Sequence, residues 1–509
     1  MISNYINISS ARDLKGGKQF WIYKALEIIP GFLAWGTLIV LIFLSWRQPI
    51  WVAFFIIVFD MYWLLKVIFL SIHQRSAFNK MQEYLKTNWL EKLTADKLAW
   101  QDIYHLVLLP RYKEDYDIVS ETILAISKAN YPKEKIVLVL AFEERAGNEA
   151  NKLADRIKQE FGDKFFKFMV TYHPDNILGE LAGKGSNIAY SARQVKLFFD
   201  EVKIDYANVV VSAFDIDTRV YPEYFGCLTY HYLITPNRTR SSFQPIPIYN
   251  NNIWQAPFFS RVVATSATFW HMMQQERPER LATFSSHAHS FKALADMDFW
   301  PVGNVSEDSR IFWRALLTFN GDYRTVPIYY PVSMDANLAP TFSHTALNLY
   351  KQQRRWGWGV ENVPYFLYGG LKNKKIPKRV FWKFAFVQLE GFWSWSTNAL
   401  IIFMLGWLPL YLGDTAFHIT ALAANLPFLT RVIMNFAMIG MLTSAIYSLK
   451  LLPPRPADKT RWSHISIFFQ WLCLPFTIIL LGAFPGIEAQ TRLMLGKYMG
   501  FWVTEKHRK

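Results

Sequence analysis

The stretch that decides the fold is VVVSAFDIDTR, residues 209–219. Three valines and an alanine surround one serine, and the run ends in Phe214, Asp215 and Asp217. A short apolar run rich in β-branched residues predicts a strand that is buried on both faces. Asp215 and Asp217 then leave the sheet at its carboxyl edge, where open α/β sheets bind ligands. Such a pair can hold Mg²⁺ or Mn²⁺ with substrate phosphates, or it can be a solvated acidic turn.

The composition indicates a membrane protein with a sizeable soluble domain. Of 509 residues, 52% are hydrophobic and 17% aromatic, and only 19% are charged. The net charge of +15, from 55 Lys and Arg against 40 Asp and Glu, suits an anionic membrane surface and anionic substrates. No basic stretch interleaved with aromatic residues suggests a nucleic-acid groove. Two distant cysteines, Cys227 and Cys473, exclude a disulfide framework and argue against a metal–thiolate site.

The N-terminal part predicts a membrane hairpin. Residues 1–27 are polar to mixed, and residues 28–72 hold two apolar runs, each about the ~20 residues that cross a bilayer. The late start and the length of the first run argue against a cleaved signal peptide. Basic residues outside the hairpin outnumber Arg47 in its turn, which places the N-terminus and the next domain in the cytoplasm. Residues 73–100 form an amphipathic linker.

Residues 101–340 alternate short apolar runs with amphipathic helical spacing, which indicates βα units and a mainly parallel, Rossmann-like sheet. Strands are expected at 105–109, 136–141 and 166–172, before the strand that ends in Asp215. Gly183-Lys184-Gly185 precedes a helix over 188–199. Its amides and ammonium could bind an anion, or the glycines could serve a plain turn.

Two acids, Glu307 and Asp308, follow Ser306 at the start of another helical stretch. An acid there can cap the helix, or it can act as a general base that takes a proton from an acceptor hydroxyl. His287-Ala288-His289 lacks a third ligand in register, so we expect an ordinary polar segment and not a metal site.

Residues 341–380 predict interfacial helices that carry Gln352-Gln353-Arg354-Arg355-Trp356. Arg355 can grip a pyrophosphate by forked hydrogen bonds, and Trp356 offers a flat face to a sugar ring. A basic amphipathic helix on the membrane surface would have the same composition.

The C-terminal part predicts further membrane segments. Residues 381–449 hold two spans, of which one contains Glu390, and 450–463 form a basic cytoplasmic loop. Residues 464–485 are interrupted by Pro475, which suggests a re-entrant hairpin that turns there. Residues 486–509 are then an interfacial helix and a tail. Both termini would be cytoplasmic. Glu390 faces a functional path or lies near the interface.

Taken in order, these motifs resemble those of the membrane-embedded processive synthases of glycosyltransferase family 2, the cellulose-synthase-like enzymes related to chitin and hyaluronan synthases. The shared motifs are Asp215-x-Asp217, Ser306-Glu307-Asp308, Gln352-x-x-Arg355-Trp356 and the tail FWVTEK at 501–506. The last matches F-x-V-T-x-K, the gating loop of bacterial cellulose synthase. The resemblance covers nearly the whole chain and implies a cytoplasmic GT-A domain between membrane hairpins.

The resemblance also implies a role for each matching residue. Asp215 would contact the nucleotide diphosphate, Asp217 would ligate Mg²⁺ or Mn²⁺, and Asp308 would be the base, with Glu307 beside it and near the acceptor. Trp356 would stack on the acceptor sugar. The nucleotide would contact Pro110, Glu114, Glu143, Glu144, Lys184, Gln352, Arg355, Thr504 and Lys506.

Two departures stand out. The family's base-reading aspartate after the second strand is replaced here by Glu143 and Glu144, which can accept the same hydrogen bonds. The membrane part is also lean for a complete translocation channel.

The sequence therefore predicts an inverting transferase that moves a sugar from a nucleotide-sugar, with UDP-sugars first, to a growing polysaccharide, with extrusion as an added step. Its partners would be the donor, a glycan or lipid-linked acceptor and membrane lipids. One alternative is single addition to a lipid or short glycan. Another is a non-enzymatic scaffold or permease, which leaves the acids at strand ends unexplained.

Overall fold

The computed structural model describes residues 4–502, and an eight-stranded mixed sheet forms the centre of the soluble part. The order in space is β3-β2-β1-β4-β7-β6-β8-β5. The strands are β1 (Tyr104–Arg111), β2 (Ile136–Glu143), β3 (Lys167–His173), β4 (Val209–Ala213), β5 (Arg219–Val220), β6 (Ser241–Ile248), β7 (Ala288–Ser290) and β8 (Arg324–Ser333). The first four in chain order pair in parallel, as predicted, whereas β7 runs antiparallel to both β4 and β6. This is the GT-A arrangement.

Helices cover both faces of the sheet because its central strands are apolar on both sides. Leu106 and Val211 face α6 (Lys184–Glu201), α9 (Phe291–Asp296) and α10 (Glu307–Thr318). Val107 and Val210 face α4 (Tyr116–Ser127), α5 (Asn148–Phe161) and α7 (Tyr224–Ile234). All four side chains are inaccessible to solvent, which confirms the strand predicted at the opening stretch.

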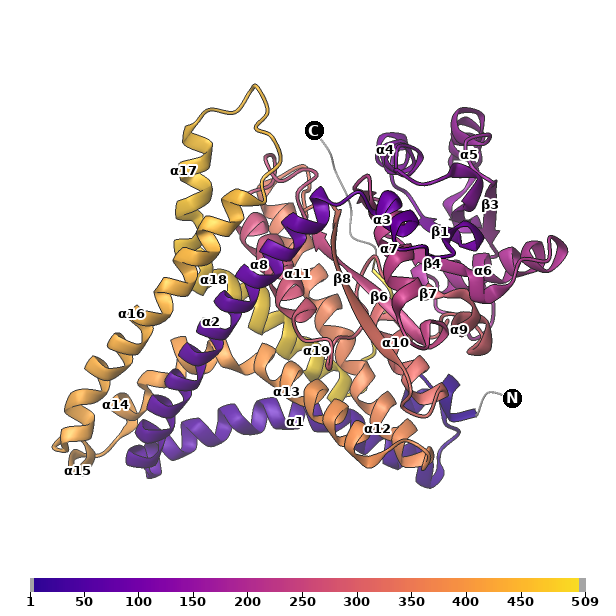
Figure 1. Cartoon of the computed structure of the whole chain (residues 1–509). Coiled ribbons are helices and arrows are strands. Elements are labelled where there is room, and N and C mark those ends of the chain that lie inside the picture. The colour runs from indigo at the N-terminus through magenta and orange to yellow at the C-terminus, as the bar shows by residue number, and fades with distance from the viewer. Residues whose placement is uncertain (1–3, 503–509) are drawn as a thin grey trace.

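Long helices extend away from this layered domain (Figure 1). They are α1 (Gly17–Arg47), α2 (Pro49–Lys86), α13 (Lys378–Phe403), the short α14 (Leu408–Leu412) and α15 (Thr415–His418), and α16 (Ala421–Lys450). A further run comprises α17 (Trp462–Phe469), α18 (Leu474–Ile478) and α19 (Phe484–Met494). Four helices of the described chain are long and apolar enough to cross a membrane, or up to five if the bent α13–α14 pair is one span. These helices indicate a membrane protein.

The predicted hairpin turn at Pro475 is wrong. The chain from Trp462 to Met494 runs as one helical segment, with a short π-helical stretch at Ile479–Ala483. Pro475 lies in the first turn of α18, where a missing backbone N–H costs no intrahelical hydrogen bond. The sharp bend occurs instead between α13 and α14, at 47°.

The helical run from Trp462 to Met494 contacts the rest of the protein near both of its ends. Near its start, Gln470 accepts a hydrogen bond of 2.7 Å from Arg261 of α8 (Phe258–Gln275). Near its end, Glu488 accepts one of 2.7 Å from Arg354 of α11 (Phe342–Gly357). The chain therefore returns to the sheet domain after α19. The remaining helices are α3 (Trp89–Ala95) and α12 (Asn362–Lys372).

Small residues let α11 and α19 approach each other closely. A Cβ added to Gly357 would lie 3.3 Å from the Cα of Gly486 and 3.4 Å from the Cβ of Ala489. The helix pair thus fixes the end of α11, where Arg355 and Trp356 lie.

A leucine at Gly357 should push these helices apart. We expect Gly357→Leu to destabilise the fold by about 1–3 kcal/mol, the usual cost of overpacking, and to lower the thermal unfolding temperature in detergent. Gly391→Leu is the matched control, because nothing lies within 4 Å of a Cβ added to this α13 glycine. Equal unfolding temperatures for the two variants would contradict the close approach.

Candidate active site

A buried lysine joins two acids that the sequence places far apart. The Lys184 Nζ atom lies 2.6 Å from Asp215 Oδ1 and 2.8 Å from Asp308 Oδ1. Lys184 begins α6, Asp215 follows β4, and Asp308 lies in the first turn of α10. Three elements thus meet at the carboxyl edge of the sheet, where the sequence predicted a ligand site.

Glycine allows this meeting of helix starts. A Cβ on Gly185 would lie 3.0 Å from the Cβ of Glu307 and 3.1 Å from the carbonyl oxygen of Pro301. A larger residue there would separate α6 from α10. The Gly-Lys-Gly segment is therefore more than a plain turn, since its ammonium is held among carboxylates.

Backbone and side-chain donors hold the two aspartates that follow β4. Ser285 donates a hydrogen bond of 2.7 Å to Asp215 Oδ2, and the backbone N–H of Asp335 donates one of 3.0 Å to Asp217 Oδ2. Asn251 donates to the carbonyl oxygen of Asp217 at 3.0 Å. Sequence reasoning missed Ser285, Asn251 and Asp335.

The two adjacent acids of α10 differ in burial: Glu307 is 2% exposed, whereas the side chain of Asp308 is 23% exposed. Burial, with the nearby Asp308 charge, raises the pKa of Glu307 to about 8, so its carboxyl group is mainly protonated at neutral pH. A protonated carboxyl group cannot accept a proton as a general base. Asp308, paired with Lys184, is thus the candidate base. Ser306 does not cap the helix with its side chain; its hydroxyl donates to Glu361 Oε1 at 2.6 Å.

His287–His289, predicted to be an ordinary polar segment and not a metal site, is a buried stretch at the start of β7. Both rings are fully buried, and the Nδ1 atom of His287 lies 2.7 Å from the carbonyl oxygen of Phe284 and 3.6 Å from Asp308 Oδ1. Burial lowers the pKa of His287, so the ring is held neutral beside the candidate base. Thr283 also donates to the carbonyl oxygen of Asp308, at 2.6 Å.

Residues of α11 also lie near this site. The ring of Trp356 lies 6.3 Å from that of Tyr249, a partly buried tyrosine whose pKa is raised by desolvation and then by Asp215. Gln352 accepts a hydrogen bond of 3.3 Å from Asn337. The positive charge of Arg355 lowers the pKa of Glu307, which opposes the effect of burial. Arg355 therefore acts electrostatically on this site.

The chain after α19 reaches the same place. The guanidinium carbon of Arg355 lies 5.3 Å from the ring centroid of Phe501. A Cβ on Gly183 would lie 2.7 Å from the Phe501 ring, so this ring packs directly on the start of α6. Thr504 and Lys506 lie outside the described residues.

The predicted nucleotide loop after β1 is internally bonded. The Glu114 carboxylate accepts hydrogen bonds from the backbone N–H groups of Tyr112, at 2.9 Å, and Lys113, at 3.2 Å, while Pro110 lies within β1, one residue before its end. Glu143, the last residue of β2, pairs with Arg145, whose guanidinium lies 4.5 Å from the Tyr112 ring centroid.

Glu144 points to another loop instead, where its carboxylate accepts from the backbone N–H of Asp175 at 3.3 Å. Of the two glutamates, Glu143 thus lies closer to the β1 loop.

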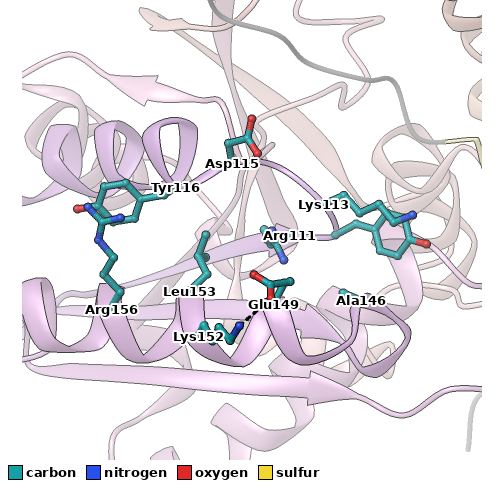
Figure 2. Close-up of a pocket in the computed structure, with 10 residues that line it drawn as sticks. Arg111, Lys113, Asp115, Tyr116, Ala146, Glu149, Lys152, Leu153 and Arg156 are labelled. Atoms are coloured by element: carbon teal, nitrogen blue, oxygen red, sulfur yellow. Dashed lines mark hydrogen bonds and ion pairs between the residues drawn. The ribbon is translucent and has the colours of Figure 1, made fainter.

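A cavity of about 560 Å³ adjoins this loop between α4 and α5 (Figure 2). Figure 2 shows the side chains of both helices and of the β1 loop pointing into it. Its charged lining comprises four cationic and two anionic residues, Arg111, Lys113, Lys152 and Arg156 against Asp115 and Glu149. It lies on the face opposite α6 and is separate from the carboxylate cluster.

No group of three or more His, Cys, Asp or Glu side chains among residues 4–502 is arranged as a metal site. Two carboxylates completed by substrate phosphate oxygens would be a different arrangement, and one common for Mg²⁺.

The fold and the site define a membrane-associated transferase of the GT-A class. Residues 210–481 match the family described as "Glycosyl transferase family group 2", and the chain belongs to this family. It is a glycosyltransferase. No curated protein sequence matches the chain.

Three similar solved structures hold a nucleotide or a nucleotide-sugar. The mannosyltransferase PcManGT from Pyrobaculum calidifontis, solved with GDP-Man and Mn²⁺, is 14% identical over 75% of this chain and 99% of its own, with a TM-score of 0.42. S. aureus TarS 1–349 with UDP-GlcNAc is 10% identical over 78% of this chain and 93% of its own, with a TM-score of 0.37. GalNAc-T7 with UDP, GalNAc and Mn²⁺ is 12% identical over 57% of each chain, at 0.32.

Removing the bridging ammonium should disable the site. Lys184→Met removes the buried cation that the partly exposed Asp215 and Asp308 share, so we expect sugar transfer to fall at least about 100-fold. Lys196→Met is the control, because Lys196 pairs with Asp200 on the exposed side of the same helix. A Lys184→Met enzyme with near wild-type turnover of labelled donor would show that the bridge is dispensable.

Proposed function

We propose that this glycosyltransferase is an integral membrane enzyme that transfers a sugar from a nucleotide-sugar to a growing polysaccharide chain. UDP-sugars are the first donors to test and GDP-sugars the second. The observation that carries the proposal is the Lys184 bridge, which holds a candidate base, Asp308, beside Asp215, the residue matched to the donor diphosphate.

The base and the acceptor define the chemistry. Asp308 takes the proton of the acceptor hydroxyl as that oxygen attacks the anomeric carbon and the nucleoside diphosphate leaves. Glu307, mainly protonated at neutral pH, donates a hydrogen bond to the acceptor. With one base and no enzyme nucleophile, the transfer inverts the anomeric configuration.

The diphosphate requires positive charge around it. Asp217 and Asp215 would hold Mg²⁺ or Mn²⁺, which would neutralise charge on the leaving diphosphate. Their carboxylates fit a hard cation whose other ligands are phosphate oxygens and water. Lys184, Arg355 and Gln352 add donors from two further elements.

The acceptor and the tail complete the active site. Trp356, beside the partly buried Tyr249, offers the face on which the acceptor sugar stacks. Phe501 lies where the tail can cover the donor, and Thr504 and Lys506 would extend that cover over the nucleotide. Exclusion of water from the donor favours transfer over hydrolysis. Pro110, Glu114, Glu143 and Glu144 are the candidate contacts of the nucleoside.

The contacts of the helices support one membrane arrangement. The end of α2 pairs with the sheet domain through Lys80 and Glu276, at 3.0 Å, so α1 leaves that side of the membrane and α2 returns. The loop after α16 also lies there, where Leu451 accepts from Asn250 at 3.3 Å. Because this loop is basic, we place the sheet domain and both termini in the cytoplasm.

A second acceptor class is a lipid or a short glycan that receives a single sugar. The small number of candidate spans favours it, since few helices are present to enclose a long polymer. Sizing the labelled product separates a polymer from a single addition.

Substitution of the two neighbouring acids tests the assignment of the base. We expect Asp308→Asn to lower kcat by about 10²- to 10⁴-fold, the usual contribution of general base catalysis. Glu307→Gln replaces a carboxyl group that is already protonated at neutral pH, so its loss should stay within about tenfold. The measurement is nucleoside diphosphate release by purified protein in nanodiscs, with a panel of UDP- and GDP-sugars and Mg²⁺, Mn²⁺ or EDTA.

A larger loss of kcat in Glu307→Gln than in Asp308→Asn would assign the role of general base to Glu307. Turnover that survives both Asp308→Asn and EDTA would overturn the proposed chemistry, and a product with the donor's anomeric configuration would overturn inversion.

The tail can be tested through its described residue. Phe501→Ala removes the ring that packs on Gly183, so we expect the KM for the donor to rise several-fold and the ratio of hydrolysis to transfer to increase. Phe436→Ala, on the exposed surface of α16, is the control. An unchanged ratio in Phe501→Ala would show that the tail does not exclude water.

A further inference from the structure

A charged cluster lies between two membrane helices and the sheet domain. Lys66 of α2 contacts Glu390 of α13 at 2.6 Å, and Arg280 of the sheet domain lies 3.9 Å from the second oxygen of Glu390. We call these three residues the portal cluster. Ser394 adds a hydrogen bond of 2.8 Å to Glu390.

The portal cluster is connected to the active site by a short loop. Arg280 lies between α8 and β7, and three residues later Thr283 binds the carbonyl oxygen of Asp308. Ser285 of the same loop binds Asp215. Between them, Phe284 packs on Trp270, at 4.7 Å between ring centroids, and Trp270 is 39% exposed. The loop that joins the cluster to the catalytic carboxylates thus carries an aromatic residue that packs on a partly exposed tryptophan.

The depth of the cluster matches the boundary of a bilayer. Lys66 is seventeen residues after Pro49, the start of α2, which at ~1.5 Å per residue is about 25 Å along a helix that must cross ~30 Å of hydrocarbon. The cluster thus lies toward the sheet-domain side of the membrane, where a lipid head group would be.

The charge of the cluster favours an anion. Two cations share one carboxylate, so the cluster carries one positive charge in excess. The side chains of Lys66 and Arg280 are 36% and 28% exposed, and each can turn toward a ligand. Within residues 4–502, the buried Nε–H of Arg280 has no hydrogen-bond acceptor. A partly exposed guanidinium and a partly exposed ammonium suit a phosphate group.

The surfaces beside the cluster suit an acyl or prenyl chain. Leu65 and Ile72 of α2 are exposed, as are Trp382 and Phe386 of α13. These exposed apolar side chains belong to the two helices that supply Lys66 and Glu390.

We propose that the portal cluster binds the phosphate group of a membrane lipid that carries the sugar acceptor. This inference rests on the proposed transferase function and names its acceptor class. The acceptor can be a growing glycan chain attached to such a lipid, or a lipid that receives a single sugar. The lipid approaches between α2 and α13, its phosphate contacts Arg280 and Lys66, and its hydroxyl-bearing part extends past Phe284 toward Asp308.

Binding of a simple alkyl phosphate tests the cluster without the reaction. We would titrate full-length protein in a neutral detergent with dodecyl phosphate, dodecanol or inorganic phosphate, and follow the thermal unfolding temperature and the binding isotherm. We expect dodecyl phosphate to bind at least tenfold more tightly than the other two probes. Arg280→Gln and Lys66→Met should each weaken it about tenfold or more, while each still leaves Glu390 one cationic partner.

Lys80→Met is the matched control. Lys80 also lies on α2 and pairs with an acid of the sheet domain, Glu276, away from α13. Equal weakening in Lys80→Met, or equal binding of dodecyl phosphate and dodecanol, would overturn the proposal. Inorganic phosphate that binds as tightly as dodecyl phosphate would overturn the lipid as its source. Nucleoside diphosphate release by the same samples measures the transferase activity separately. A failure of the binding prediction can therefore be distinguished from a failure of the proposed function.

Discussion

The active site depends on one buried ammonium group between two carboxylates. Burying ionised carboxylates is costly unless they are paired and hydrogen-bonded, and Lys184 supplies the positive charge for both Asp215 and Asp308. Glu307 lies 4.0 Å from the same Nζ atom, so an ionised Glu307 would add a third negative charge to one cation. Protonation of Glu307 avoids this, and its pKa is raised first by burial and second by the charge of Asp308. The division of roles between two adjacent acids thus follows from charge balance.

The membrane part is linked to the same site by polar contacts. Glu361, which follows α11, accepts hydrogen bonds at one oxygen from the backbone N–H groups of Val305, at 3.1 Å, and Ser306, at 3.0 Å. Its other oxygen accepts from the indole N–H of Trp358 at 3.0 Å. The start of α10, and with it Asp308, is therefore positioned by a helix connection that packs on α19. A displacement of the membrane-side helices would move the base.

The sequence predicted the parts of the site that follow from strand ends and helix starts. Asp215, Lys184 and Asp308 each flank a strongly periodic element, and parallel strands place their carboxyl ends at one edge. Ser285 and His287 were not foreseen, because their position depends on β7, a three-residue strand that pairs antiparallel with β4 and has no periodic signal of its own. Pro475 was misinterpreted because proline is tolerated in a first helical turn as well as at a break.

The two ends of the loop that carries Arg280 and Ser285 also differ in the charge that surrounds them. The active-site end contacts Asp215 and the backbone of Asp308, where the acidic side chains outnumber the lysine, whereas the membrane end adds positive charge near Lys66. The phosphate of the acceptor would be attracted by the portal cluster, while its uncharged hydroxyl could approach Asp308. The loop can therefore orient an acceptor that has both groups, with its phosphate toward the membrane and its hydroxyl toward the base. This polarity requires no movement of the fold, because both ends of the loop are already held by neighbouring elements.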